Sequence, residues 1–156
     1  MNRLHVLVAD RDSKARGTLR ARLMDCGYRV TTVGTGDRIL RRCEIDPPDV
    51  LVVDVALPDM DGYELCERLR TDALAQGITV ILLTEPPDDL SRTYAEQMVE
   101  FAGADFFLGK PYDPSVVLQL IDDVRRRTRP AVTRAPLVRP RPATWPTARI
   151  LLRGTR

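Results

Sequence analysis

The chain has 156 residues, 44% of them hydrophobic, which suffices for one hydrophobic core rather than two. No stretch approaches the roughly 18 consecutive apolar residues of a membrane span, and a single histidine, His5, argues against a histidine-rich metal site and against a Ser/His/Asp triad. The net charge of +2 conceals a division, because residues 1–123 carry 22 acidic and 14 basic side chains, a net charge of −8, whereas ten arginines follow.

Five short apolar segments are typical of buried β-strands. The second of them alternates between apolar and polar side chains, as a strand at the edge of a sheet does. The single histidine falls in the first and is expected to be a partly buried strand residue. In chain order the segments are residues 4–9 followed by Asp10, 28–33, 50–53 followed by Asp54, 78–83 followed by Thr84, and 106–108 followed by Gly109 and Lys110.

Helical periodicity separates these strands. The first helix has Asp12 or Ser13 available as N-cap, and the last has Asp113 as N-cap and Pro114 at its first position. Short alternating β-α units predict an α/β fold, an open sheet of five parallel strands covered by five helices on its two faces. The apolar stripes are Ala15, Leu19, Leu23 and Cys26; Ile39, Leu40 and Cys43; Leu65, Cys66 and Leu69; Leu90, Tyr94, Met98 and Phe101; and Val117, Leu120, Ile121 and Val124.

Polar side chains follow four of the strands at the point where each strand ends. Because parallel strands end together at one edge of a sheet, we expect Asp10, Asp54, Thr84 and Lys110 to lie close together. Two carboxylates, a hydroxyl and an ammonium group suit a divalent cation together with a phosphoryl group.

The sequence changes character near Thr128. Residues 128–156 are rich in proline and arginine and contain few aliphatic side chains, so burial does not offset the entropy cost of ordering them. We therefore expect a folded domain over residues 1–127 and a largely disordered basic tail over residues 128–156. Its one tryptophan, Trp145, is a thin signal for base stacking, and a solvated extension is the simpler interpretation.

The three cysteines, Cys26, Cys43 and Cys66, are widely spaced and form no CxxC pair. They predict reduced thiols packed against helices in a cytoplasmic protein. The N-terminus runs directly into the first strand without a signal-peptide pattern.

Four motifs together resemble the receiver domain of bacterial response regulators, the phosphoacceptor module of two-component systems. They are VLVADRD after the start of the chain, DVLVVDVALPDMDGYEL around Asp54, ILLT before Glu85, and GADFFLGKPY around Lys110. The resemblance runs from about Leu4 to Arg127. It implies a flavodoxin-like fold with the strand order 2-1-3-4-5.

The resemblance also implies roles for individual residues. Asp54 matches the aspartate that receives the phosphoryl group, and Mg²⁺ is the implied cofactor. The implied metal ligands are Asp10, Asp54 and the backbone carbonyl of Ala56, with Asp12 as an alternative. Thr84 and Lys110 match the phosphoryl-binding residues, and Pro111 matches the cis-proline. Thr84 and Phe107 match the pair that switches conformation, although Phe107 lacks the hydroxyl of the tyrosine often found there.

Two positions depart from the family, and both adjoin the expected site. Receivers normally carry two adjacent acids after the first strand, whereas here Arg11 follows Asp10 and Asp12 comes one place late. Glu85 follows Thr84 where the family prefers a small residue. We expect Arg11 and Glu85 to form an ion pair across the pocket. The simpler interpretation is a divergent receiver that still works, because Asp12 can turn toward the metal or Asp10 can suffice; the alternative is a receiver with weak Mg²⁺ binding because of Arg11 and slow phosphorylation.

The sequence therefore predicts a phosphoacceptor switch rather than an enzyme. The expected partners are a sensor histidine kinase or phosphotransfer protein and a downstream protein that binds the face of the fourth and fifth helices; a homodimer is left open. The alternative is a docking domain that acts without phosphorylation. We expect no membrane association and no folded DNA-binding domain, because few residues follow Arg127.

Overall fold

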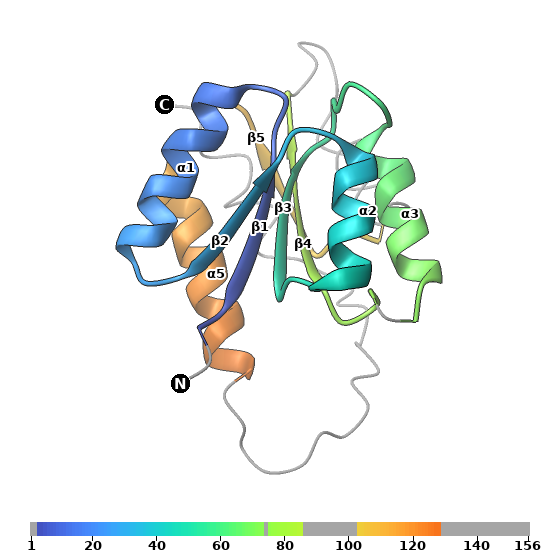
Figure 1. Ribbon diagram of the computed structural model, residues 1–156. Helices are drawn as coiled ribbons and strands as arrows, with labels where there is room; N and C mark the ends of the chain where they lie inside the picture. Colours follow the sequence, from blue (N-terminus) through green and yellow to red (C-terminus); the bar gives the residue numbers. More distant parts are fainter. Residues whose placement is uncertain (1–2, 74, 86–102, 129–156) are drawn as a thin grey trace, which may run out of the picture.

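The five predicted strands form one parallel sheet in the order β2-β1-β3-β4-β5, which confirms the fold class (Figure 1). The computed structural model describes residues 3–73, 75–85 and 103–128. The strands are β1 (His5–Ala9), β2 (Arg29–Val33), β3 (Val50–Asp54), β4 (Thr79–Thr84) and β5 (Phe106–Gly109).

Within the described residues, four helices cover the sheet: α1 and α5 lie together on one face and α2 and α3 on the other (Figure 1). None of these helices is long and apolar enough to cross a membrane. The predicted fourth helix and residues 129–156 of the predicted disordered tail lie outside the described residues, whereas Thr128, the first residue of that predicted tail, is helical. The helices are α1 (Ser13–Asp25), α2 (Gly36–Ile45), α3 (Gly62–Thr71) and α5 (Pro114–Thr128).

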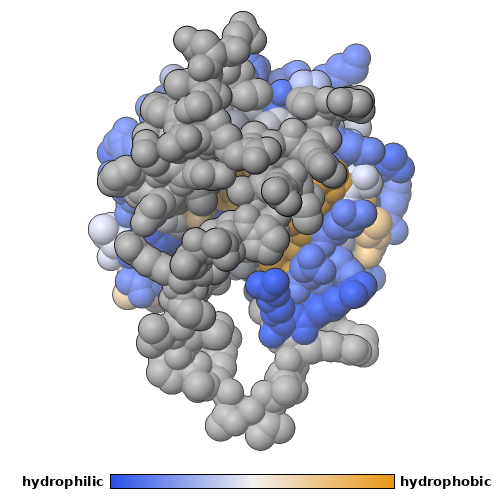
Figure 2. Space-filling model, turned by 180° about the vertical axis from the view of Figure 1, so that it is seen from behind, coloured by the Kyte–Doolittle hydropathy of each residue, from blue (hydrophilic) through white to orange (hydrophobic). Residues whose placement is uncertain are grey.

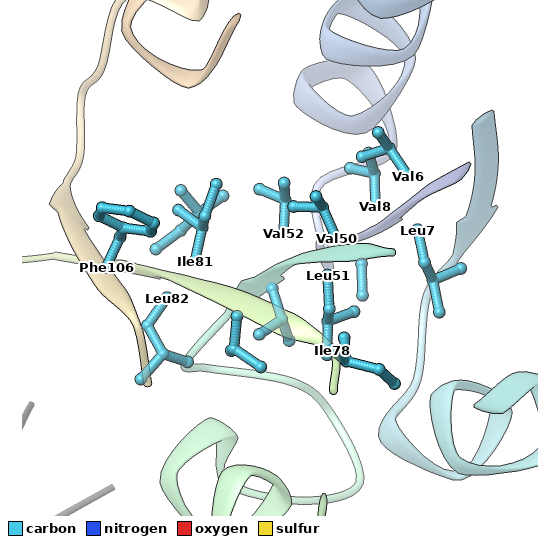
Figure 3. Close-up of a cluster of buried hydrophobic side chains, with 14 of the residues drawn as sticks. Val6, Leu7, Val8, Val50, Leu51, Val52, Ile78, Ile81, Leu82 and Phe106 are labelled. Atoms are coloured by element: carbon cyan, nitrogen blue, oxygen red, sulfur yellow. The ribbon is translucent and has the colours of Figure 1, made fainter. Parts of the chain in front are cut away.

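The core lies on both faces of the central strands. Successive side chains of a strand point to opposite faces, so Val6 and Val8 of β1 pack on one side of the sheet and Leu7 on the other (Figure 3). All three are fully buried, as is Leu51 of β3. This explains why these strands are continuous apolar runs, whereas β2, at the sheet edge, is only partly buried.

The outer surface carries few large apolar side chains. Among the described residues, Met24 and Ile45 are the large hydrophobic side chains that are exposed. From behind, most described residues on the visible face are hydrophilic (Figure 2).

Helix α1 begins where its cap was predicted but ends differently from the expectation. The Asp12 carboxylate accepts hydrogen bonds from the amides of Lys14 and Ala15 and so caps the helix. Cys26, predicted to pack against helices, is exposed instead. The reason is that the helix ends at Asp25, so Cys26 lies beyond the stripe that buries Leu19 and Leu23.

Asp49 joins three strands at the amino edge of the sheet. Its amide donates to the carbonyl of His5, its carbonyl accepts from the amide of Thr79, and its carboxylate accepts from the amide of His5 at 2.7 Å. His5 is only 2% exposed, more buried than expected, and its Nε2 lies 2.9 Å from Thr31 Oγ1 on the neighbouring strand β2. These bonds fix the relative alignment of β1, β3 and β4.

A second polar cluster at this edge joins α3 to β4 and β5. The guanidinium of Arg70 donates to Asp105 Oδ2 at 3.0 Å, and Asp105 also accepts from the amide of Val80. The remaining donors of Arg70 reach the carbonyls of Gly103, Gln76 and Ile78 at 2.7, 3.1 and 3.0 Å. One side chain therefore holds together the starts of two strands.

Candidate functional site

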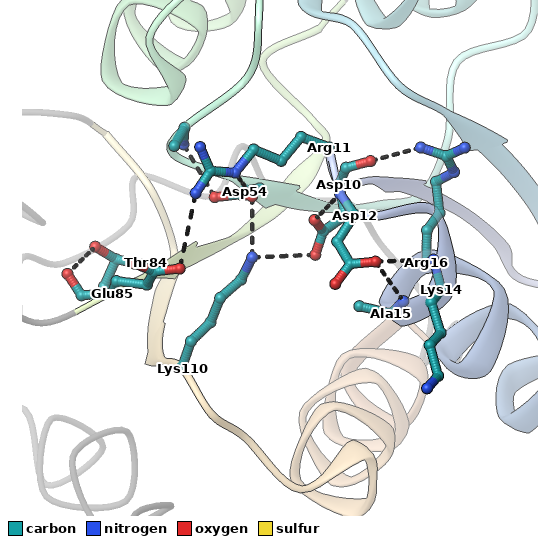
Figure 4. Close-up of polar contacts among 11 residues, drawn as sticks. Asp10, Arg11, Asp12, Lys14, Ala15, Arg16, Asp54, Thr84, Glu85 and Lys110 are labelled. Atoms are coloured by element: carbon teal, nitrogen blue, oxygen red, sulfur yellow. Dashed lines mark hydrogen bonds and ion pairs between the residues drawn. The ribbon is translucent and has the colours of Figure 1, made fainter.

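Strand register brings the four predicted polar residues to the carboxyl edge of the sheet (Figure 4). Ala9 pairs with Val53, so the next residues, Asp10 and Asp54, end neighbouring strands at the same level. Asp10 is 1% and Asp54 3% exposed. The two buried carboxylates thus lie side by side.

Lys110 bridges these carboxylates. Its Nζ donates to Asp54 Oδ2 at 2.9 Å and to Asp10 Oδ2 at 3.2 Å. Burial alone would lower the pKa of Lys110, but the hydrogen bonds and charges of Asp54 and Asp10 outweigh it and raise that pKa above its ordinary value. Lys110 therefore stays protonated and supplies a permanent positive charge.

The other oxygen of each carboxylate is held by the backbone. Asp54 Oδ1 accepts from the amide of Ala56 at 3.0 Å, and Asp10 Oδ1 from the amide of Asp12 at 2.8 Å. Burial raises the pKa of Asp10, whereas the Asp12 amide and the Lys110 charge oppose this rise. Both side chains are thus fixed in orientation, with Oδ2 facing Lys110.

Arg11 extends over the pocket and contacts two acids. Its Nη2 lies 3.8 Å from Glu85 Oε1, which confirms the predicted ion pair, and its Nε lies 4.0 Å from Asp54 Oδ2. The side chains of Arg11 and Glu85 are 55% and 73% exposed. An ion pair this exposed contributes only about 0–1 kcal/mol to stability, so its effect on the fold is small.

The residues of this pocket fit a divalent cation poorly. Mg²⁺ prefers oxygen ligands, and the resemblance to receiver domains implies Mg²⁺ as the cofactor of this pocket. Here the Asp12 carboxylate is committed to capping α1. Across residues 3–73, 75–85 and 103–128, no three histidine, cysteine or acidic side chains lie together as metal ligands would. Asp10, Asp54 and the Ala56 carbonyl are the groups left for a cation, and Lys110 and Arg11 already face the two carboxylates.

The remaining predicted residues also lie at or beneath this edge. Thr84 is 9% exposed, and its hydroxyl donates to the carbonyl of Glu85 at 3.4 Å. The peptide bond between Lys110 and Pro111 is cis, the isomer that the resemblance implies. Phe107 is buried in β5, where it pairs with Leu82 of β4.

Two contributors to the site were not predicted. Arg16 donates from Nη1 to the Asp10 carbonyl at 2.6 Å and so holds the end of β1. Tyr112 is partly buried against the core; burial, and secondly the charges of Asp10 and Asp54, raise its pKa to about 12. Arg16 lies six residues after its partner and Tyr112 follows a cis-proline, so no helical or strand spacing points to either contact.

Comparison with known proteins identifies what this site resembles. The family model described as the response regulator receiver domain matches residues 6–122. The chemotaxis response regulator CheY4 of Vibrio cholerae is 27% identical with a TM-score of 0.71, and the match covers 79% of this chain and 99% of that one.

Two curated relatives are similar over the same part of the chain. The response regulator MprA of Mycobacterium leprae is 35% identical over 127 residues, which are 81% of this chain and 53% of that protein. The probable transcriptional regulator ycf27 of Cyanophora paradoxa is 32% identical over 128 residues, 82% of this chain and 51% of that protein.

The chain spans about half the length of the curated relatives it matches. Several of those relatives are named transcriptional regulators. The expectation that no folded DNA-binding domain accompanies this domain therefore has no support from the comparisons.

Proposed function

We propose, from the premise that this chain belongs to the response regulator receiver domain family, that it accepts a phosphoryl group on Asp54 in a two-component phosphorelay. The observation that carries the proposal is the environment of this carboxylate. Asp54 is 3% exposed at the carboxyl edge of the sheet, with its Oδ2 2.9 Å from the ammonium group of Lys110. A nucleophile beside a fixed cation is the arrangement that phosphoryl transfer requires.

In the proposed reaction, a carboxylate oxygen of Asp54 attacks the phosphorus atom of a phosphohistidine on a sensor histidine kinase or phosphotransfer protein. An oxygen–phosphorus bond forms, the phosphorus–nitrogen bond breaks, and the electron pair of that bond remains on the imidazole. The product is an acyl phosphate. Lys110 neutralises charge on the transferred oxygens throughout, because its raised pKa keeps it protonated.

Thr84 would then bind the new phosphoryl group. Its hydroxyl lies at the end of β4, in register with the last residue of β5, and donates a long 3.4 Å hydrogen bond to the carbonyl of Glu85. Rotation toward the phosphoryl group costs little, since that bond is weak. Movement of Thr84 would change the packing around Phe107 on the neighbouring strand.

We further propose that this change is read by a downstream protein at the face that includes α5. Helix α5 begins four residues after Lys110, so displacement of the lysine is coupled to the start of that helix. The signal would thus pass from the buried pocket to an exposed surface.

The experiment is the intact mass of the protein after incubation with acetyl phosphate, with and without Mg²⁺, or with a cognate kinase. We expect one phosphoryl adduct in the wild type and none in Asp54→Asn. The matched control is Asp37→Asn, an exposed aspartate on α2, which should retain the adduct. An undiminished adduct in Asp54→Asn would refute the assignment, and no adduct with any donor would favour the docking domain that acts without phosphorylation.

A further inference from the structure

Arg11 occupies the place in the sequence where the family carries its second acid, and its guanidinium is directed at the phosphoacceptor. The 4.0 Å separation of Arg11 Nε from Asp54 Oδ2 is close to the 3.8 Å separation of Nη2 from Glu85. Figure 4 shows the Arg11 side chain reaching toward Asp54 and Glu85. Arg11 is therefore a resident cation of the site as well as a surface partner of Glu85.

The charges of the pocket decide what this cation does. Asp10, Asp54 and Glu85 contribute three negative charges, and Lys110 and Arg11 two positive ones, so these five groups carry a net charge of −1. With an acid in place of Arg11, the same five positions would carry a net charge of −3, much of which a divalent cation would offset. In this chain Arg11 already offsets that part of the negative charge, and its guanidinium repels a further cation.

The chemistry of the guanidinium suits the binding of a phosphoryl group, which a metal ion would otherwise assist. Its planar fork donates several parallel hydrogen bonds to phosphate oxygens, and it remains charged at every relevant pH. Arg11 is 55% exposed, so its side chain can move from Glu85 toward an incoming phosphoryl group without disturbing the core. Lys110, 17% exposed and hydrogen bonded to both carboxylates, stays in place on the other side.

We propose that Arg11 takes the place of the metal ion: it binds the phosphoryl oxygens opposite Lys110 and allows Asp54 to be phosphorylated without Mg²⁺. This inference rests on the proposed function. With acetyl phosphate as donor, Asp54 attacks the phosphorus atom, the phosphorus–oxygen bond to the acetyl group breaks, and acetate leaves with the electron pair. Glu85 holds Arg11 beside Asp54 until a phosphoryl group arrives. Because that group carries more negative charge than the Glu85 carboxylate, it replaces Glu85 as the partner of Arg11.

The test measures the rate of adduct formation with acetyl phosphate in excess EDTA. The wild type should react, and Arg11→Gln should react at least 10-fold more slowly, since one cation is lost from a site that works by charge neutralisation. Arg11→Lys keeps the charge without the fork and should fall between the two. Arg20→Gln, which changes an exposed arginine on α1, is the matched control and should react like the wild type.

A second measurement does not depend on phosphorylation. Titration of Mg²⁺ followed by the amide NMR shifts of residues 10–12 and 54–56 should give weak binding in the wild type. In Arg11→Asp the affinity should rise at least 10-fold, because the family charge pattern is restored. Thermal melts of each variant show that it is folded, as expected for a substitution at an exposed position.

The outcomes separate this inference from the proposed function. An adduct that forms on Asp54 only with Mg²⁺, or an EDTA-resistant reaction that Arg11→Gln does not slow, would overturn the role of Arg11 and leave phosphorylation of Asp54 standing. Absence of any adduct under all conditions would overturn both. An unchanged Mg²⁺ affinity in Arg11→Asp would show that Arg11 does not exclude the cation.

Discussion

Replacement of Arg70 by alanine should destabilise the fold far more than the same replacement of Arg68, two residues earlier on helix α3. The Arg70 side chain is only 23% exposed, and it donates hydrogen bonds to Asp105 and to three main-chain carbonyls. The Arg68 side chain is 55% exposed and pairs with Glu64 one turn away. Both changes are arginine to alanine within one helix, so the change in helix propensity is nearly the same.

The expected magnitudes follow from these contacts. Each hydrogen bond contributes about 1 kcal/mol net, and water entering beside a partly exposed side chain recovers some of the loss. Arg70→Ala should therefore lower the free energy of unfolding by about 3 kcal/mol, near the range for removing one partner of a buried pair. Arg68→Ala should lower it by about 0.3–0.5 kcal/mol, as exposed helical ion pairs do.

Urea unfolding followed by circular dichroism measures the difference. With a slope of about 2 kcal/mol per molar urea, the midpoint of Arg70→Ala should fall by roughly 1.5 M and that of Arg68→Ala by roughly 0.2 M. Arg70→Lys should recover only part of the loss, because one ammonium group does not reach four separated acceptors. A difference of less than about 1 kcal/mol between the two alanine variants would refute the reasoning.

Three further predictions concern other parts of the fold. In the native protein, a thiol reagent should modify Cys26 alone among the cysteines, since Cys43 and Cys66 are buried with pKa values raised to about 11 and about 12; rapid native labelling of all three, read by mass, would contradict this. Burial lowers the pKa of His5 below its ordinary 6.5. The stability that neutral His5 contributes is therefore present above pH 6.5 and is lost as the pH falls below it. In urea unfolding, the free energy of unfolding of His5→Gln should fall less between about pH 7.5 and about pH 5.5 than that of the wild type. Asp59 accepts the first two amides of α2 at 2.7 and 2.9 Å, so Asp59→Ala should cost about 1 kcal/mol in urea unfolding and Asp59→Asn less; equal losses would show that the acceptor oxygens are unimportant.

Much of the site could be predicted because it depends on backbone features that leave a clear trace in the sequence. Apolar runs that stop at Asp10, Asp54 and Thr84 indicate where parallel strands end, and parallel strands end at one edge. Helix starts were predictable for a similar reason: Asp12 and Asp113 are short acceptors placed just before helical stripes, and each accepts an amide of the following turn.

What could not be predicted depends on long side chains and distant partners. The contact of Arg11 with Asp54 joins residues 43 positions apart, and an exposed arginine has many rotamers that no spacing selects. The partners of Arg70 are carbonyls and a carboxylate that only the folded chain brings near it. In the sequence, Arg70 therefore cannot be distinguished from Arg68, an arginine of the same helix that faces solvent. Cys26 was wrongly placed because a helical stripe does not mark the residue at which the helix stops.

The hydrogen bonds of Asp49 at the amino edge align the starts of β1, β3 and β4, and this alignment determines where the three strands end at the opposite edge. From His5 to Asp10, from Asp49 to Asp54 and from Thr79 to Thr84 the chain advances five residues in each case. The register places Asp10 and Asp54 at the same height and Thr84 one residue, about 3.3 Å, beyond them. The length of each strand is thus constrained as well as the identity of its apolar residues, because one inserted or deleted residue would shift a functional group by a full residue and turn it to the other face.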